Sequence, residues 1–298
     1  MNDSAFELPL PSLFSFRECL AYMARSPLEC LYEADGESVT RLVRAGSGTA
    51  LVRLTCPGER AMRVQVLGGS VSQQERELLI RYIRDWFDLD RDLEPFMAIA
   101  RTDSLAGPLV RERAGLRIVG IPDLFEALCW AIVGQQVNLA FAYKLKRRLT
   151  EAYGESAERE GTVYRLFPQP ERLAGASVEE LYGLQLTRNK AIAVLTVAER
   201  MAGGQLSRER LLALPDSQAV DRELTAIRGV GPWTSQYVRM RCLGDPTSLP
   251  IGDAGLQNAA KILLGLDRKP TEPELRDLFA PWRGWESYLT FYLWRTLY

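Results

Sequence analysis

Two glycines in the segment 224–237 (LTAIRGVGPWTSQY) form a pattern that could bind an anion. Gly229 and Gly231 flank Val230, and Pro232 stands where a helix could begin. Glycines permit a tight turn and leave backbone N–H groups uncovered, and N–H groups at a helix N-terminus attract negative charge. A phosphate of a DNA backbone carries such a charge. The same pattern also suits an ordinary turn between two helices, closed by a glycine.

Asp253 is the acidic residue whose surroundings most favour chemistry. It follows the loop segment 248–252 (SLPIG), and Leu256, Ala260 and Leu263 then recur at helical spacing. Asp253 is therefore a natural N-cap. Capping and catalysis are compatible, because a carboxylate held at a helix N-terminus can also stabilise a positive charge that develops beside it. The residues of this stretch alone leave both roles open.

The elements that must position these residues are helices. A helix that ends near residue 227, the glycine hairpin and a helix that begins at Pro232 predict a helix-hairpin-helix unit at about 221–243. Trp233 and Tyr237 lie four residues apart, on one face of the second helix. Upstream, Asp123 suits the cap of a helix, and the segment 134–136 (GQQ) interrupts the helical pattern. From residue 120 onward the pattern is helical almost throughout.

The N-terminal part of the chain shows a different periodicity. Apolar and polar residues alternate within residues 37–68, which predicts an antiparallel sheet of three or more strands. Helices are expected at about 14–25 and 72–99, and Ser72 with Glu75 suits a capping box at the start of the second. We therefore predict an α+β fold, with an N-terminal domain over 1–113 and an all-α region over 114–298.

Composition narrows the function. The 298 residues include no histidine and five cysteines, none of them at C-x-x-C spacing. This argues against zinc and iron–sulfur sites, excludes His-dependent triads, and favours reduced thiols. We expect no membrane span and a cytoplasmic protein, because no apolar run of suitable length occurs. The net charge of −1 argues weakly against a nucleic-acid partner, but a local basic face can exist despite it.

Taken together, the motifs resemble a known enzyme family. The hairpin GVGPWT, followed by LPIGD and a helix, resembles the helix-hairpin-helix DNA glycosylase superfamily. The alkylbase branch, DNA-3-methyladenine glycosylase II, is similar to this chain in four further segments, namely 125–138 (FEALCWAIVGQQVN), 167–173 (FPQPERL), 184–191 (LQLTRNKA) and 282–295. The resemblance covers residues 120–298, and the strand-rich N-terminal part agrees in type.

The resemblance implies a monofunctional glycosylase that flips alkylated purines out of double-stranded DNA and hydrolyses them off. Asp253 matches the catalytic position, and Trp233, Tyr237 and Trp294 match the base pocket, whose π faces attract cationic bases. The position of a Schiff-base lysine is occupied by Trp233, so no lyase activity is expected. We leave Trp282 and Trp285 to the core, while Phe14 or Phe16 could reach the pocket.

The resemblance also implies DNA contacts. Gly229, Val230 and Gly231 match the phosphate-binding hairpin, Gln136 matches the side chain that fills the gap left by a flipped base, and Gln135 and Asn138 lie nearby. No cofactor is required. A monovalent cation could be held by the main-chain carbonyls of the residues Thr225, Ile227 and Val230. Two departures could weaken phosphate contacts: Pro232 lacks an N–H, and Glu286 stands where basic residues are common.

Two other functions remain open. One is a non-catalytic DNA-binding protein that kept the helix-hairpin-helix scaffold, and the presence of Asp253 favours the enzyme over it. The other is a glycosylase for oxidised or deaminated bases, which would differ only in the chemistry of its pocket. We expect a monomer that meets DNA at the nucleoid.

Overall fold

An antiparallel sheet forms the first part of the computed structural model, which describes residues 4–58 and 60–298. Its described strands lie in the order β1-β5-β4-β3-β2. Their bounds are β1 Ala5–Pro9, β2 Tyr32–Ala34, β3 Ser38–Ala45, β4 Gly48–Thr55 and β5 Ala61–Leu67. The predicted sheet is confirmed. Strand β1 was not predicted, and it adds an edge to the sheet by pairing Ala5 with Gln65 and Pro9 with Ala61.

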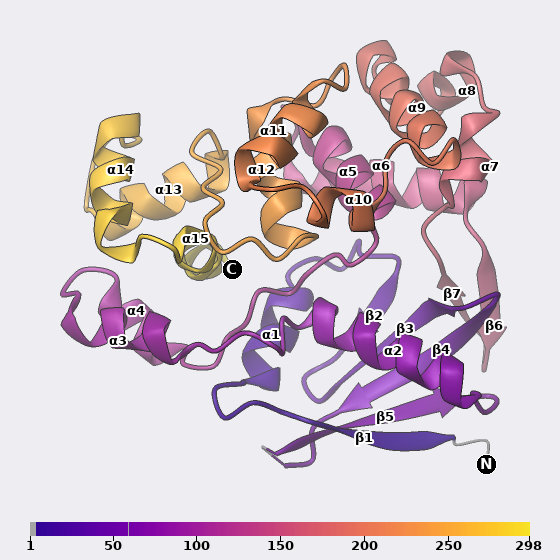
Figure 1. Ribbon diagram of the computed structural model, residues 1–298, viewed down its shortest axis with the longest axis horizontal. Helices are drawn as coiled ribbons and strands as arrows, with labels where there is room; N and C mark the ends of the chain where they lie inside the picture. The colour runs from indigo at the N-terminus through magenta and orange to yellow at the C-terminus, as the bar shows by residue number, and fades with distance from the viewer. Residues whose placement is uncertain (1–3, 59) are drawn as a thin grey trace.

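Two helices of the N-terminal part pack against this sheet. They are α1, Phe16–Met23, and α2, Gln73–Trp86 (Figure 1). The capping box at the start of α2 is confirmed, because the Ser72 side chain accepts from the Glu75 N–H and the Glu75 side chain accepts from the Ser72 N–H. The single helix expected over 72–99 is wrong. Helix α2 ends at Trp86, and just beyond it the guanidinium of Arg117 donates to the carbonyls of Asp88 and Arg91.

After this break, α3 (Glu94–Thr102) and α4 (Gly107–Glu112) leave the sheet and join the C-terminal helices (Figure 1). Phe96 of α3 packs with Trp282, Trp285, Tyr288 and Tyr292, at ring-centroid distances of 5.1–5.6 Å. Trp282 is fully buried and Trp285 half-buried, so both belong to this core as expected.

The remainder of the chain is mainly helical, as predicted. The bounds of its longer helices are α5 Leu124–Gly134, α6 Leu139–Tyr153, α9 Arg188–Ala202, α11 Ser217–Thr225, α12 Pro232–Arg241, α13 Ala254–Leu263, α14 Glu272–Phe279 and α15 Glu286–Trp294. Shorter helical segments are α7 Pro170–Ala174, α8 Val178–Gly183, α10 Arg208–Leu212, η1 Ala280–Trp282 and η2 Arg295–Leu297. In the part of the chain that the structure describes, no helix is both long and apolar enough to traverse a bilayer.

A two-stranded hairpin interrupts the helical region, so this region is not all-α as expected. Strands β6 (Ser156–Arg159) and β7 (Thr162–Arg165) are joined through Glu160 and Gly161, both with positive φ. Such a turn matches the twist of a hairpin. In Figure 1 the hairpin extends from the helices toward the sheet, and β7 contacts β3.

Buried charges join the sheet to the helices. Arg41 of β3 lies 2.6 Å from Glu126 of α5. Lys146 of α6 lies 3.2 Å from Glu126 and 3.1 Å from Glu29, which follows α1. All four side chains are at most 7% exposed. These ion pairs fix the position of α5 and α6 relative to the N-terminal part, because breaking a buried pair leaves an uncompensated charge.

Candidate active site

Asp253 is the N-cap of α13, as predicted, and its carboxylate is held from three directions. Its Oδ1 accepts from the N–H of Leu256 at 2.7 Å and from the indole Nε1 of Trp294 at 2.9 Å. Its Oδ2 accepts from the indole Nε1 of Trp233 at 3.1 Å. A carboxylate offers about four acceptor positions. The position that these donors leave open is therefore on Oδ2 of the half-buried Asp253.

The three aromatic residues expected in the base pocket lie together with Asp253. The rings of Trp233 and Tyr237 are 5.5 Å apart at 33°, and those of Tyr237 and Trp294 are 6.1 Å apart at 35°. Both pairs of rings are tilted, and Tyr237 contacts both indoles. Trp294 comes from the end of α15 and the other two from α12, so the arrangement requires segments far apart in the sequence.

Gly255 keeps this arrangement compact, and sequence reasoning missed it. A Cβ at Gly255 would lie 3.0 Å from Oδ1 of Asp253 and 3.4 Å from the indole of Trp294. The first contact is tighter than most packed atoms show, so the carboxylate of Asp253 would have to shift, while the second is at the limit of ordinary van der Waals contact. Its place two residues after the capping Asp253 is the only signal that the sequence offers.

The two hairpin glycines play different parts. Gly229 has a φ of +88°, and a Cβ there would lie 2.6 Å from Cβ of Ala193 in α9, so both backbone conformation and close packing require glycine. Gly231 has an ordinary φ of −92° and open space where a Cβ would be. Its missing side chain instead leaves the N-terminus of α12 accessible.

The N-terminus of α12 carries free donors. Within residues 4–58 and 60–298, no protein acceptor is recorded for the N–H groups of Gly229, Gly231, Trp233 and Thr234, and no side chain caps the helix. Pro232 contributes no N–H. Val230 is buried and anchors the hairpin, and its N–H donates to the carbonyl of Ile227. Free donors at a helix N-terminus suit an anion such as a phosphate.

The loop 135–138 lies beside this hairpin. Nε2 of Gln135 donates to the carbonyl of Gly229 at 3.0 Å and to Oγ1 of Thr234 at 2.9 Å, so its side chain is already engaged with the hairpin. Gln136 is exposed, with a φ of +54° that is unusual for a residue with a side chain. Asn138 is exposed and caps α6 through Phe141.

A lysine that the sequence analysis did not single out supports the same loop. Nζ of Lys190 in α9 donates to the carbonyls of Val133 and Gln135, at 2.8 and 2.7 Å. These carbonyls belong to the end of α5, where a cation is favoured. Burial lowers the pKa of Lys190.

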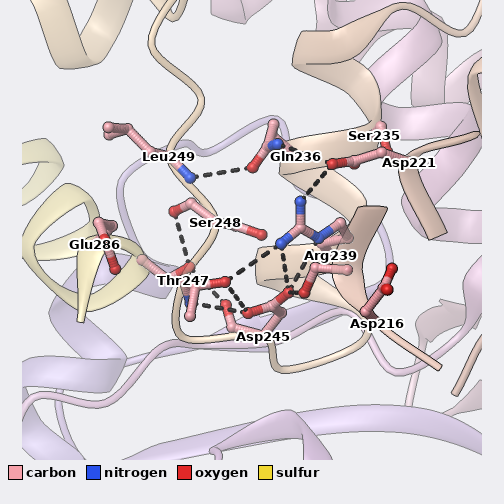
Figure 2. Close-up of polar contacts among 12 residues, drawn as sticks. Asp216, Asp221, Ser235, Gln236, Arg239, Asp245, Thr247, Ser248, Leu249 and Glu286 are labelled. Carbon is pink, nitrogen blue, oxygen red and sulfur yellow. Dashed lines mark hydrogen bonds and ion pairs between the residues drawn. The ribbon is translucent and has the colours of Figure 1, made fainter. Parts of the chain in front are cut away.

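A polar network holds the loop that leads to Asp253 (Figure 2). The buried guanidinium of Arg239 contacts Asp221 of α11 at 2.7 Å and Asp245 at 2.6 Å. Asp245 also accepts from Ser217, while Oε1 of Gln236 accepts from the N–H of Leu249 at 3.1 Å. Both ends of this loop are therefore fixed before the chain reaches Asp253.

The N-terminus of α15 closes the loop from its other side. Oγ of Ser287 donates to the carbonyls of Asp245 and Ser248. Glu286 lies on the same side in Figure 2, and its carboxylate accepts from the N–H of Gly284 at 2.8 Å. Burial raises the pKa of Glu286. Glu286 thus neighbours the loop before Asp253.

The sequence analysis also missed the residues that hold the hydroxyl of Tyr237. Its hydroxyl accepts from Nε1 of Trp130 at 2.8 Å and from Nη1 of Arg241 at 2.9 Å. The same Nη1 lies 2.8 Å from the hydroxyl of Tyr22 in α1. Burial raises the pKa of Tyr237 to about 12, so its hydroxyl stays protonated at neutral pH. No local pattern links residues so far apart in sequence.

The contribution of α1 therefore differs from the one expected. Phe14 and Phe16 do not reach the aromatic group. They pack against Phe87, at centroid distances of 6.1 and 5.8 Å. Tyr22 takes their place, because it lies almost two helical turns further along, with its ring 4.4 Å from Phe291 of α15.

The carbonyls expected to hold a monovalent cation border one depression. Thr225, Ile227 and Val230 line an open hollow of about 480 Å³ at the hairpin. Among the described residues no backbone donor is recorded for the carbonyls of Thr225 and Val230, and that of Ile227 accepts one N–H. Unpartnered carbonyl oxygens are suitable ligands for a hard cation.

Comparison with known proteins identifies the family of the chain. Residues 129–283 match the HhH-GPD superfamily of base excision DNA repair proteins, and residues 5–123 match the AlkA N-terminal domain. The chain belongs to the HhH-GPD superfamily. Within it, a DNA-3-methyladenine glycosylase of Bacillus subtilis is 44% identical, over 100% of this chain and 98% of the relative.

Two solved structures share the fold. A 3-methyladenine DNA-glycosylase from Archaeoglobus fulgidus has a TM-score of 0.84 at 21% identity, over 97% of each chain. An 8-oxoguanine glycosylase/lyase of Clostridium acetobutylicum, in complex with double-stranded DNA, has a TM-score of 0.74 at 18% identity, over 99% of this chain and 97% of that one. At these identities the likeness shows the fold alone, and the fold serves more than one substrate.

Proposed function

We propose that this protein is a monofunctional DNA glycosylase that hydrolyses alkylated purines, of the 3-methyladenine and 7-methylguanine type, from double-stranded DNA. The observation that carries the proposal is the carboxylate of Asp253, held by the indoles of Trp233 and Trp294 beside the ring of Tyr237. The arrangement pairs a fixed negative charge with π faces. The name of the Bacillus subtilis relative supports the same substrate class.

The chemistry follows from this pairing. A flipped alkylpurine that carries a positive charge is attracted to the faces of Trp233 and Trp294. When the bond between C1′ and the base nitrogen breaks, the electron pair leaves with the base and positive charge develops on the sugar. The open acceptor position on Oδ2 of Asp253 stabilises that charge or orients the attacking water. The water oxygen bonds to C1′, and its proton passes to the carboxylate or to solvent.

Strand cleavage by Schiff-base chemistry requires an accessible amine, and we propose that this protein lacks it. Trp233 occupies the position that the amine would need, and an indole nitrogen is not a nucleophile. The amine of Lys190 donates to two carbonyls at the end of α5. The protein should therefore leave an abasic site in an intact strand.

Binding of DNA is assigned to the hairpin and the adjacent loop. The free N–H groups at the start of α12 take a phosphate, and Gln136 enters the gap left by the flipped base. A monovalent cation at the carbonyls of Thr225, Ile227 and Val230 would add positive charge beside that phosphate. We propose that the protein acts as a monomer on nucleoid DNA in the cytoplasm, with no other cofactor.

A substrate panel tests the proposal. Duplexes with a single 7-methylguanine, 3-methyladenine, 8-oxoguanine or uracil are incubated with excess enzyme, and the free base and the strand are measured separately. We expect release of the two alkylpurines, with strand breaks appearing only after alkali. Faster release of 8-oxoguanine or uracil would favour a glycosylase for oxidised or deaminated bases. Tight binding without release of any base would favour a non-catalytic DNA-binding protein. A covalent complex trapped with borohydride would contradict the absence of lyase activity.

A further inference from the structure

The loop between α5 and α6 is held at both of its ends. Gln135 is the C-cap of α5, and its N–H donates to the carbonyl of Ile132. Asn138 is the N-cap of α6, where its side chain accepts from the N–H of Phe141 at 2.9 Å. Between these two caps, Gln136 is exposed and has a φ of +54°. A side chain in this left-handed conformation persists only where the surrounding structure holds the backbone in place.

Lys190 of α9 supplies a large part of this support. Its Nζ donates to the carbonyl of Val133 at 2.8 Å and to that of Gln135, the residue before Gln136, at 2.7 Å. Both distances are typical of charge-assisted hydrogen bonds, which are about twice as strong as neutral ones. In the described part of the chain no carboxylate pairs with Lys190, and burial is the cause that lowers its pKa. The charge of Lys190 is therefore directed at the end of α5 and not at an ion pair.

The same face of α9 also supports the glycine hairpin. Ala193 follows Lys190 by three residues, so the two side chains lie on one face of the helix. A Cβ at Gly229 would lie 2.6 Å from Cβ of Ala193, which shows how closely the hairpin packs on α9. Nε2 of Gln135 joins the loop to the hairpin directly, through the carbonyl of Gly229 at 3.0 Å and Oγ1 of Thr234 at 2.9 Å. One helix face therefore fixes the loop and the hairpin relative to each other.

The loop and the hairpin have to meet the same DNA duplex. Under the proposed function, the N–H groups at the start of α12 take a phosphate and Gln136 enters the gap left by the flipped base. A side chain that is already held at the correct distance from the hairpin loses little freedom on binding, so more of its contact energy favours the flipped state. The ammonium of Lys190 also neutralises the negative C-terminal end of α5, which would otherwise oppose the approach of DNA phosphates.

We infer that Lys190 is a positioning residue for base flipping, which acts on DNA through the loop 135–138 and not by contact with the damaged base. The inference rests on the proposed function and adds to it a residue outside the candidate base pocket. The two hydrogen bonds of Lys190 stay on the carbonyls of Val133 and Gln135 while Gln136 occupies the gap. The contribution of Lys190 should therefore be largest where a paired base has to be replaced in the stack, and smallest where the damaged base has no partner.

The test compares two duplexes that differ only opposite the damaged base. One carries 7-methylguanine opposite cytosine. The other carries it opposite an abasic-site analogue, so no base pair has to be broken and no partner base is left behind. Single-turnover rate constants are measured with excess wild type, Lys190→Met, Lys190→Arg and Lys144→Met. Lys144 is the matched control, because it is an exposed lysine of α6 for which no contact with the described residues is recorded.

The variants should differ on the two duplexes. For Lys190→Met we expect release from the paired duplex to fall about tenfold, since two hydrogen bonds from a charged group are lost. Release from the duplex without a partner base should change less than about twofold, which also shows that the variant is folded. Lys190→Arg keeps the charge and the donors and should recover part of the rate on the paired duplex. Lys144→Met should behave as wild type on both duplexes.

A double-mutant cycle checks that the effect of Lys190 passes through Gln136. Gln136→Gly lacks the side chain that enters the gap, so adding Lys190→Met to it should cause no further loss on the paired duplex. Equal losses from Lys190→Met in the two backgrounds would show that Lys190 acts without Gln136, and the inference would be overturned.

The outcomes separate this inference from the proposed function. If Lys190→Met slows release from both duplexes by the same factor, or from neither, Lys190 does not position the loop for flipping and the inference fails. It also fails if Lys144→Met shows the same pattern, because the loss would then follow from net charge alone. Release of 7-methylguanine from neither duplex by wild type would instead overturn the proposed function.

Discussion

At the scale of single residues, the candidate site depends on side chains whose hydrogen bonds are already satisfied. Asp253 receives three donors, so its carboxylate is rigid and offers one acceptor position on Oδ2. A preorganised charge needs no rearrangement as positive charge develops on the sugar, which favours an electrostatic role for Asp253. Gln136 is the opposite case, an exposed side chain on a backbone that is unfavourable for it.

Replacement of Gln136 separates strain from function. Gln136→Gly removes a left-handed strain of about 1 kcal/mol, partly offset by the greater freedom of glycine in the unfolded chain. We expect the free energy of unfolding in urea to stay the same or rise, while release of 7-methylguanine falls about tenfold if the side chain fills the gap. Gln136→Asn, which tolerates the same backbone, is the control for conformation. Unchanged base release in Gln136→Gly would contradict the wedge role.

Residues that act through local spacing could be predicted from the sequence. Asp253 as a cap, and Trp233 with Tyr237 on one face of a helix, follow from intervals of three and four residues. Tyr22 and Trp130 could not be predicted, because they are connected to Tyr237 by contacts between distant elements. Trp130 donates to the hydroxyl of Tyr237, and Arg241 donates to the hydroxyls of both tyrosines. Only the folded chain brings them together.

At the scale of elements, the hairpin before α12 combines one glycine that the fold requires with one that it does not. Gly229→Ala should destabilise the hairpin, because of its positive φ and the contact with Ala193. Gly231→Ala should leave the free energy of unfolding unchanged, since its φ is ordinary and a Cβ meets open space. If a phosphate approaches the free N–H groups there, Gly231→Ala should still weaken DNA binding several-fold, measured by fluorescence anisotropy. Unchanged affinity for DNA would show that the phosphate does not bind at these N–H groups.

The loop between α12 and Asp253 should depend on pH. Burial opposes ionisation of Asp245, but hydrogen bonds from Ser217, Thr247 and Arg239 outweigh it and lower the pKa from 3.8 to about 2. A lowered folded-state pKa stabilises the protein above the unfolded value, and this stability is lost as the pH falls from about 4 toward 2. Linkage gives a contribution of about 2 kcal/mol at neutral pH.

The measurement is urea unfolding between pH 5 and pH 2, for wild type and for Asp245→Asn. Wild type should lose stability more steeply over this interval, and the variant should be less stable at neutral pH. Parallel pH profiles for the two proteins would show that Asp245 does not hold the loop by its charge.

Elements were predictable where their ends carry capping residues. Ser72, Asp123 and Asp253 all cap helices at the expected positions. Strand β1 has only five residues, too few for its alternation to stand out in the sequence, and is defined by its pairing with β5. The break between α2 and α3 depends on Arg117, which is distant in sequence. The local periodicity therefore predicted one continuous helix across the break. The turn of the β6–β7 hairpin lies at Glu160 and Gly161, and the glycine is a turn signal in the sequence. It was not used as evidence for a hairpin because the surrounding pattern is helical.

At the scale of the whole molecule, the net charge and the buried ion pairs carry different information. The net charge of −1 argued weakly against nucleic acid, yet the chain belongs to a superfamily of DNA repair proteins. A sum over the molecule does not describe a local surface. Inside the molecule, the pairs of Arg41 and Lys146 with Glu126 and Glu29 connect the sheet to the helices that hold Trp130 and Tyr143.

This connection can be measured as stability. Arg41→Met leaves Glu126 with Lys146 alone and should lower the free energy of unfolding by about 3–5 kcal/mol. The double variant Arg41→Met/Glu126→Gln should recover part of the loss, because the buried charge is removed as well. Urea unfolding of the single and double variants measures both effects. A loss in Arg41→Met as small as that of a surface pair, about 1 kcal/mol or less, would show that the pair does not join the two parts.

The most direct test of the central claim is base release by Asp253→Asn under single-turnover conditions, on a duplex with one 7-methylguanine. Asparagine is also a good N-cap, so the helix should persist while the negative charge is lost. Asp216→Asn is the control, because Asp216 caps α11 in the same way, through the N–H of Ala219. We predict a fall of at least about 100-fold for Asp253→Asn and none for Asp216→Asn. Equal rates for wild type and Asp253→Asn would contradict the assignment of Asp253 as the catalytic residue.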